Sequence, residues 1–316
     1  MKLSVMVEPY TINVSTCTFN DNRALFVGGV IQARTTTIDI VQSNFVHNDA
    51  NSGGAVSASN SHVLVIWSTI LFNEVTTYGG AISTDEYTTL KISGSKFTRN
   101  KAGWGGAVRD SKDSSVNIAG SRFIRNKADQ GGAISALSKI VSINVSRFVS
   151  NEASRWGGAI ELWQSATIKL NIAWSKFINN TAAYGGGAIN VNHANVIFVI
   201  TLTEFEGNVA QTDGGAISVR YNASTTANIE INNSTFSKNR AKHNGGAVST
   251  VGVSTLTMVV MSGGNFDNNE AVNGGAIYTQ SITLSVNESL IRENIGETGI
   301  VYTTQSAVVF LGDVML

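Results

Sequence analysis

The segments FTRNKAGWGGAV at residues 97–108 and FIRNKADQGGAI at residues 123–134 decide the fold of this chain. Each begins with a Phe three positions before an Asn, and each carries Gly-Gly-Ala followed by Val or Ile, beginning five positions after that Asn. The same two markers recur along the chain with a mean period of about 27 residues. Self-similarity at a fixed period is typical of a solenoid or another repeat architecture.

The first marker, an apolar residue followed three positions later by Asn, occurs eleven times, nine times with Phe and twice with Ile (Ile70 and Ile291). Its asparagines are Asn22, Asn48, Asn73, Asn100, Asn126, Asn151, Asn180, Asn208, Asn239, Asn269 and Asn294. The second marker has ten double glycines, which begin at Gly28, Gly53, Gly79, Gly105, Gly131, Gly157, Gly186, Gly214, Gly245 and Gly274. Ten copies in a fixed phase indicate architecture rather than a phosphate-binding loop.

The sequence between the markers alternates apolar and polar residues and is rich in β-branched residues, as at 89–92 and 167–172. This pattern predicts strands, and no segment shows a sustained helical period. We expect three short strands in each repeat, coiled into an all-β parallel β-helix of about 11 coils that forms one repeat domain, residues 1–316. Strands stacked about 4.8 Å apart would place the Phe residues in an aromatic stack. The Asn side chains would form a hydrogen-bonded ladder, and the glycines would supply a positive φ at a tight corner.

The paired Phe-x-x-Asn and Gly-Gly-Ala-Ile/Val repeats resemble those of the chlamydial polymorphic outer membrane protein family, from about Phe19 to Asn294. The resemblance implies a right-handed parallel β-helix that acts as the exposed passenger of an autotransported adhesin. The apolar run at the N-terminus is too short for a secretory signal peptide, and the chain contains no C-terminal membrane barrel sequence. We therefore expect this chain to be a piece of a longer protein.

The composition limits the partners and the chemistry. The formal net charge is +0 and only 14 % of the residues are charged, so the chain has no overall basic field for nucleic acid or an anionic membrane. No apolar run reaches the length of a membrane-spanning helix. One cysteine, Cys17, excludes a disulfide framework within the chain and a multi-cysteine zinc site.

The sequence predicts no catalytic, metal or cofactor site. We expect the residue after each Ile or Val of the second marker to point outward in a column that includes Ser83, Arg109, Ser135, Glu161 and Ser218. Arg109 and Glu161 would be roughly 10 Å apart in this column, without the converging pair of acids that glycosidic chemistry needs. The histidines fall at different phases of the repeat and make no metal-ligand spacing: His47, His62, His193 and His243.

Four aromatic residues precede double glycines and are the candidate binding residues: Tyr78, Trp104, Trp156 and Tyr184. Gln130 interrupts the series. Stacked rings at a corner protect the strand ladder, and exposed aromatic faces also bind sugars and dominate interface energies. The hypothesis is that Trp104 and Trp156 contribute to partner binding, so that replacing both with Ala weakens adhesion and leaves the melting temperature nearly unchanged.

These observations predict a non-enzymatic adhesion or interaction surface, extracellular or at the cell surface, whose partner is a glycan or a cell-surface protein. A long face that repeats at every coil suits extended or multivalent partners. Two alternatives are a carbohydrate-active β-helix enzyme, a lyase or hydrolase, and a structural stalk that holds another domain away from a surface. The uniform coil length, 25 to 31 residues, argues against the enzyme because a catalytic cleft usually needs long loops.

Overall fold

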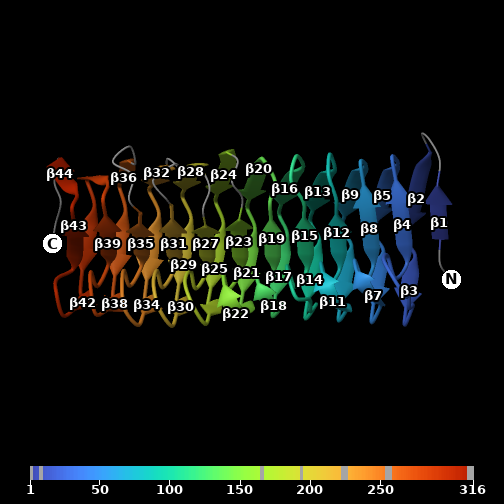
Figure 1. Ribbon diagram of the computed structural model, residues 1–316, viewed down its shortest axis with the longest axis horizontal. Helices are drawn as coiled ribbons and strands as arrows, with labels where there is room; N and C mark the ends of the chain where they lie inside the picture. Colours follow the sequence, from blue (N-terminus) through green and yellow to red (C-terminus); the bar gives the residue numbers. More distant parts are fainter. Residues whose placement is uncertain are drawn as a thin grey trace. The chain divides into compact units, whose positions relative to one another are not determined.

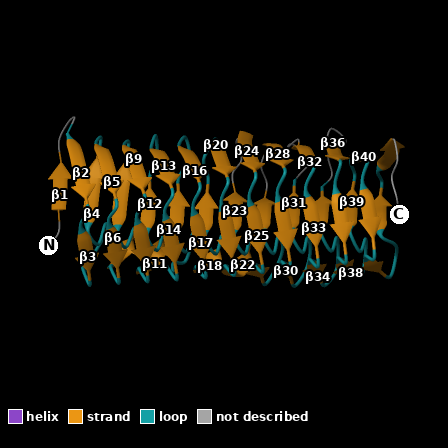
Figure 2. Cartoon of the chain, turned by 180° about the vertical axis from the view of Figure 1, so that it is seen from behind, coloured by secondary structure: helices purple, strands orange, loops and turns teal. Residues whose placement is uncertain are grey.

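The computed structural model describes residues 3–6, 10–163, 167–192, 195–221, 227–252 and 258–311. This described part contains 44 strands and no helix. The strands of successive coils pair in parallel and form a β-solenoid of about 11 turns. Figures 1 and 2 show these strands. The predicted all-β parallel fold is confirmed. The chain divides into two compact units: unit 1 contains residues 1–153 and 159–161, and unit 2 contains residues 154–158 and 162–316.

Four sheets, here named A, B, C and D in their order along a coil, make up each unit. In unit 1, sheet A contains β1 (Leu3–Met6), β4 (Ile31–Arg34), β8 (Val56–Ser59), β12 (Ile82–Thr84), β15 (Val108–Asp110) and β19 (Ile134–Ala136). Sheet B contains β2 (Thr11–Ser15), β5 (Thr37–Val41), β9 (His62–Ile66), β13 (Thr89–Ser93), β16 (Ser115–Ala119) and β20 (Ile140–Asn144). Sheet C contains β3 (Thr18–Asn20), β6 (Asn44–Val46), β10 (Thr69–Leu71), β14 (Lys96–Thr98), β17 (Arg122–Ile124) and β21 (Arg147–Val149). The strands of sheet D are β7 (Asp49–Ser52), β11 (Glu74–Tyr78) and β18 (Lys127–Gln130).

In unit 2, sheet A contains β27 (Ile189–Asn192), β31 (Ile217–Arg220), β35 (Val248–Val251), β39 (Ile277–Gln280) and β43 (Val301–Thr304). Sheet B contains β24 (Thr167–Ala173), β28 (Asn195–Thr201), β32 (Ala227–Asn232), β36 (Met258–Ser262), β40 (Thr283–Asn287) and β44 (Ala307–Leu311). Sheet C contains β25 (Lys176–Ile178), β29 (Glu204–Glu206), β33 (Thr235–Ser237), β37 (Asn265–Asp267) and β41 (Leu290–Arg292). The strands of sheet D are β26 (Thr181–Ala182), β30 (Val209–Ala210), β34 (Arg240–Ala241), β38 (Glu270–Ala271) and β42 (Ile295–Gly296). Two further strands, β22 (Glu152–Trp156) and β23 (Ile160–Trp163), contain residues of both units.

The three strands predicted in each repeat are the strands of sheets A, B and C. The fourth strand, in sheet D, lies between the Asn and the double glycine of a repeat and was not predicted from the sequence. The fourth strand is short because the double glycine that follows it turns the backbone out of sheet D. In the pairing of β11 with β7, the register shifts between Val75 and Tyr78.

The Phe stack fills the core of each unit as predicted. In unit 1 the rings of Phe97, Phe123 and Phe148 lie parallel, with successive centroids 4.8 Å apart. In unit 2 the centroids of Phe205 and Phe236 are 4.7 Å apart. All of these side chains are fully buried. The ring spacing equals the strand spacing because parallel, in-register pairing places each Phe directly above the next.

The Asn ladder also forms, and it bonds to the backbone as well as to itself. The Asn126 Nδ2 donates to Oδ1 of Asn151 at 3.0 Å and to the carbonyl of Phe97 at 3.1 Å. Its Oδ1 accepts from both the backbone N–H and the Nδ2 of Asn100, each at 3.0 Å. Asn239 has the equivalent bonds in unit 2. These buried amide groups therefore supply the hydrogen-bond partners of the adjacent coils, whereas an apolar side chain would leave buried donors and acceptors unpaired.

A second ladder, which the sequence analysis did not predict, runs along the start of sheet C. The backbone N–H of Ser95 donates to Oγ of Ser121 at 3.1 Å, and the Ser95 Oγ donates to the carbonyl of Ser93 at 2.9 Å. The hydroxyl thus closes the turn between sheets B and C in its own coil and bonds to the adjacent coil at the same time.

One prediction about the surface is wrong. The column after each Ile or Val of the second marker was expected to face solvent, but most of its side chains are buried: Ser83 and Ser135 are 6 % and 2 % exposed and Glu161 is 1 % exposed, whereas Arg109 is half-buried. The double-glycine loop covers this face of sheet A. Gly131 has a φ of +63°, and a Cβ on it would lie 2.1 Å from the carbonyl oxygen of Ile134, so only glycine permits the loop to fold back onto the strand.

Candidate functional site

The two candidate binding residues of unit 1 directly precede the double glycine in adjacent coils, and Tyr78 is the last residue of β11. Tyr78 and Trp104 are paired in adjacent coils, and their rings meet edge to face with centroids 6.1 Å apart. The guanidinium of Arg109, from β15 beneath them, lies 5.4 Å from the Tyr78 centroid and 5.7 Å from the Trp104 centroid. Tyr78 is 42 % exposed, whereas Trp104 is half-buried. The arginine thus holds both rings through cation–π contacts, and the tyrosine presents the larger free surface.

Unit 2 repeats this arrangement with a different arginine. Trp156 and Tyr184 pack with centroids 5.0 Å apart, and the Arg220 guanidinium lies 4.4 Å from the Trp156 centroid. Arg220 also forms an ion pair with Asp213 at 2.6 Å, which fixes its position. Tyr184 is 44 % exposed and Trp156 is half-buried. The structure therefore places the four predicted binding residues as two pairs, one in each unit, and in both pairs the tyrosine is the more exposed partner.

Asp110 lies beside Arg109 on β15, but its side chain points into the core and is fully buried. Burial raises the pKa of the Asp110 carboxyl to about 7, although hydrogen bonds from Ser138 and Thr84 and the charge of Arg109 act in the opposite direction. Burial also lowers the pKa of the Arg109 guanidinium. The carboxyl is held by two hydroxyls inside the coil and has no contact with solvent, so its position suits packing rather than chemistry on a polymer substrate.

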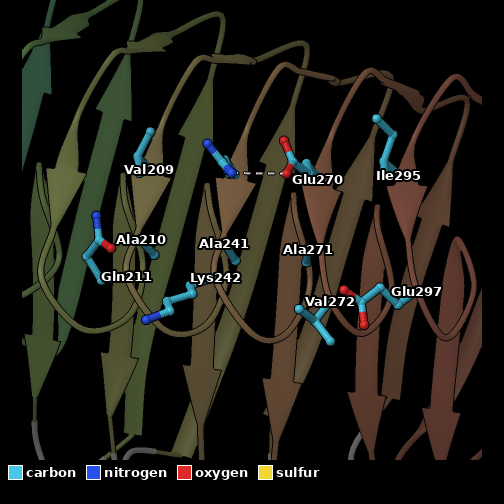
Figure 3. Close-up of a pocket in the computed structure, with 11 residues that line it drawn as sticks. Val209, Ala210, Gln211, Ala241, Lys242, Glu270, Ala271, Val272, Ile295 and Glu297 are labelled. Carbon is cyan, nitrogen blue, oxygen red and sulfur yellow. Dashed lines mark ion pairs between the residues drawn. The ribbon is translucent and has the colours of Figure 1, made fainter.

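Shallow grooves run along sheet D in each unit, where the sequence analysis identified no site. In unit 2 the groove has a volume of about 500 Å³ and is lined by three rows of side chains (Figure 3). Ala210, Ala241 and Ala271 form its floor, and an ion pair between Arg240 and Glu270 at 3.1 Å crosses one edge. Its other edge carries Gln211, Lys242, Val272 and Glu297.

The groove of unit 1, about 690 Å³, has the same construction over Val75 and Ala102. Lys101 and Glu74 form an ion pair across adjacent coils at 2.5 Å along its edge. The signal that could have identified both grooves is the small residue two positions after most marker asparagines, which leaves a low floor between taller neighbours. Each groove is lined by residues of four successive coils, a length that suits an extended ligand.

The remaining candidates for chemistry do not come together. His47 stacks on Phe72 with centroids 5.1 Å apart, and His193 lies outside the described residues. Cys17 is half-buried, and its thiol lies 3.2 Å from the carbonyl of Ser15. Among the described residues, no group of three or more His, Cys, Asp or Glu is arranged to hold a metal ion. In the same part of the chain no helix is long and apolar enough to span a membrane.

Comparison with known families identifies the repeat. The Chlamydia polymorphic membrane protein repeat matches residues 203–220, 233–251 and 263–280. Each matched segment runs from a strand of sheet C through the marker Asn and the double glycine into sheet A, in three consecutive coils of unit 2. The chain therefore carries repeats of the Chlamydia polymorphic membrane protein type, folded as a β-helix. No curated protein and no solved structure matches the chain.

Proposed function

We propose that this chain is a non-enzymatic, adhesin-like β-helix that is displayed at a cell surface, as the passenger of an autotransported protein, and binds an extracellular glycan or cell-surface protein. The observation that carries the proposal is the match of three consecutive coils to the Chlamydia polymorphic membrane protein repeat. The geometry supports it, since the ladders inside each unit leave the outward side chains in fixed, repeated positions.

The arrangement of the carboxylates supports binding rather than catalysis. A glycosidase needs two carboxyl groups that face a common substrate. Asp110 and Glu161 are both buried, and Asp213 is held by Arg220 and by the amide of Asn244. These acids are occupied by contacts within the protein or enclosed by it, so they are poorly placed to act on a polysaccharide.

The contacts with the partner are proposed to come from Tyr78, Trp104, Trp156 and Tyr184. The tryptophans cover arginines, so replacing them by Ala would also expose a partly desolvated guanidinium and lower stability. The tyrosines are better probes because more than two fifths of each is exposed. A matched control is the pair Tyr87 and Trp174, which are 64 % and 63 % exposed and lie at other corners of the two units.

The test is adhesion of protein-coated beads to cultured epithelial cells. We expect wild-type beads to adhere, Tyr78→Ala/Tyr184→Ala beads to adhere several-fold less, and Tyr87→Ala/Trp174→Ala beads to adhere like wild type. Circular dichroism confirms that the variants are folded. Absence of adhesion by wild-type beads would contradict the proposed function. An equal loss of adhesion in the control variant would contradict the assignment of the four aromatic residues to the binding surface. Release of new reducing ends from a polysaccharide would favour the carbohydrate-active alternative.

A further inference from the structure

Five exposed cations gather on the outer face of sheet C in unit 1, although the whole chain has a formal net charge of +0. Lys96, Arg122 and Arg147 occupy the first position of β14, β17 and β21. Arg99 and Arg125 occupy the turns that follow β14 and β17, both with a positive φ of 54°. We name these five residues the basic face.

The register of sheet C brings these charges together. In the strand register Lys96 lies directly opposite Arg122, and Arg122 lies directly opposite Arg147. Three cations therefore occupy adjacent strands about 4.8 Å apart. Arg125 occupies in the next coil the position that Arg99 has in its own. The two are neighbours because the backbone N–H of Arg99 donates to the carbonyl of Ile124, the residue before Arg125. Like charges directly opposite one another on neighbouring strands destabilise a sheet. The basic face therefore has an electrostatic cost that the fold does not require.

No acid of the described residues forms an ion pair with any of these five cations. The neighbouring lysines on sheet D are neutralised, since Lys101 pairs with Glu74 at 2.5 Å and Lys127 pairs with Glu152 at 2.7 Å. Neutralisation thus ends at the edge of sheet C, and the basic face is left with its charge free for a ligand.

The same face of unit 2 shows that the solenoid does not need cations here. Lys176 on β25 pairs with Glu204 on β29, and Glu206 pairs with Lys238 at 3.7 Å. Asp267 pairs with Arg292 at 3.1 Å. In unit 2 the positions equivalent to Lys96, Arg122 and Arg147 begin with Lys176 and Glu204, which form an ion pair, and continue with the uncharged residues Thr235, Asn265 and Leu290. The other two ion pairs of this face involve the residue after the Phe, so these strands of unit 2 carry no row of adjacent cations.

We propose that the basic face binds a linear sulfated polysaccharide; this deepens the proposed function by naming the class of glycan, and it rests on that function for the surface location. Arginine guanidinium groups bind planar or tetrahedral oxyanions through paired, charge-assisted hydrogen bonds. A polymer with an anionic group at regular intervals is complementary to cations that repeat at every coil. Arg99 is supported from below by Phe72, whose ring centroid is 5.4 Å from its guanidinium carbon.

The surroundings of the basic face favour a polysaccharide over other polyanions. Single-stranded nucleic acids are held by aromatic side chains on which bases stack, and Phe72, beside the face, is covered by Arg99. Stable binding to a membrane surface commonly adds exposed apolar side chains that insert between lipids to the attraction of cations for anionic headgroups. The side chains between the cations are Thr98, Ile124 and Val149, all half-buried.

The experiment measures binding of the chain to immobilised heparin at physiological ionic strength. The test variant is Arg122→Gln/Arg125→Gln/Arg147→Gln. The control variant is Lys169→Gln/Lys238→Gln/Arg292→Gln, which removes the same charge from exposed residues of unit 2. We expect wild type and control to bind alike, the test variant to bind about tenfold or more weakly, and desulfated heparin to bind none of them. The melting temperature of the test variant should equal or exceed that of wild type, because repulsion is removed.

Three outcomes would overturn the inference: no binding of wild type to heparin, an equal loss in both variants, or tighter binding of the same face to a DNA duplex or to phosphatidylserine vesicles. Bead adhesion to cells whose sulfated chains have been removed enzymatically separates the two proposals. Undiminished adhesion to the treated cells, with the test variant adhering as well as wild type, would refute the proposal that the basic face binds a sulfated polysaccharide, while the adhesin function would stand. Heparin binding without adhesion to any cell would refute the adhesin function, while polysaccharide binding by the basic face would stand.

Discussion

Unit 1 and unit 2 have the same interior on sheet C, but the outer faces of this sheet carry different charges in the two units. In unit 1 the strands and turns read SKFTRNK (95–101) and SRFIRNK (121–127), and in unit 2 they read SKFINNT (175–181) and TEFEGNV (203–209). Phe and Asn are unchanged because each is bonded or stacked to the coil before and after it. The outward residues meet only solvent and their neighbours, so their charge is free to differ. A solenoid of this kind therefore separates the residues that maintain the fold from those that select a partner.

A second difference between the units lies inside sheet A. Asp110 occupies an inward position in unit 1, where it bonds to Thr84 and Ser138. The corresponding inward residues of unit 2 include Val219 on β31 and Thr250 on β35, which carry no charge. Unit 1 consequently contains a titratable group in its core at a position where these unit 2 strands have none.

The largest expected effect tests whether the interiors are truly equivalent. Replacing Asn126 with Leu in unit 1, or Asn239 with Leu in unit 2, leaves buried donors and acceptors of the adjacent coils unpaired, at about 1 to 3 kcal/mol for each group. We expect both variants to lose more than about 3 kcal/mol of unfolding free energy, by similar amounts. Urea denaturation followed by circular dichroism measures the loss. A loss confined to one unit would show that the two ladders are not equivalent.

An intermediate effect comes from pH and is specific to unit 1. The folded chain holds the Asp110 proton up to about pH 7, whereas the unfolded chain releases it near the ordinary value of 3.8. The folded state therefore binds more protons between these values, and stability falls as the pH rises from about 4 to about 7.

The Asp110→Asn variant should lack this part of the pH dependence, because Asn keeps the hydrogen-bonding shape without titrating. Melting temperatures at pH 4 and pH 7 measure it, and we expect a decrease of several degrees for wild type and a smaller one for the variant. The Asp213→Asn variant of unit 2, at a carboxyl already paired with Arg220, is the control. Equal pH dependence in wild type and Asp110→Asn would show that the core carboxyl ionises normally.

The smallest effect concerns the outer faces and should differ in sign between the units. Arg122→Gln removes repulsion with Lys96 and Arg147 and should stabilise the chain by a few tenths of a kcal/mol. Lys176→Gln breaks the ion pair with Glu204 and should destabilise it by about 0.2 to 1 kcal/mol, since both side chains are partly exposed. Both differences should shrink in high salt. Unfolding curves at low and high salt measure them, and effects of the same sign would mean that the local charge contrast is energetically unimportant.

The strands, the Phe stack and the Asn ladder could be predicted because they depend on positions that repeat in the sequence. The burial of Ser83 and Glu161 could not, because strand alternation separates two faces without indicating what covers either. The covering loop is ordered by backbone contacts of the double glycine. Likewise, the sequence places Trp104 near a corner, but the contact of its ring with Arg109 depends on how that loop folds back over β15.

The sequence by itself determined the coil, its period and the side chains inside it, since in-register stacking places the same residue type of successive repeats in direct contact. Only the tertiary structure decided three things: the fourth strand and its groove, the arginines beneath the aromatic pairs, and the ion pairing on the outer faces. These depend on side chains and loops from coils 25 or more residues apart, such as Lys101 with Glu74 or Arg109 with Tyr78. Their geometry is set by the path of the backbone between strands, which the repeat pattern leaves unspecified.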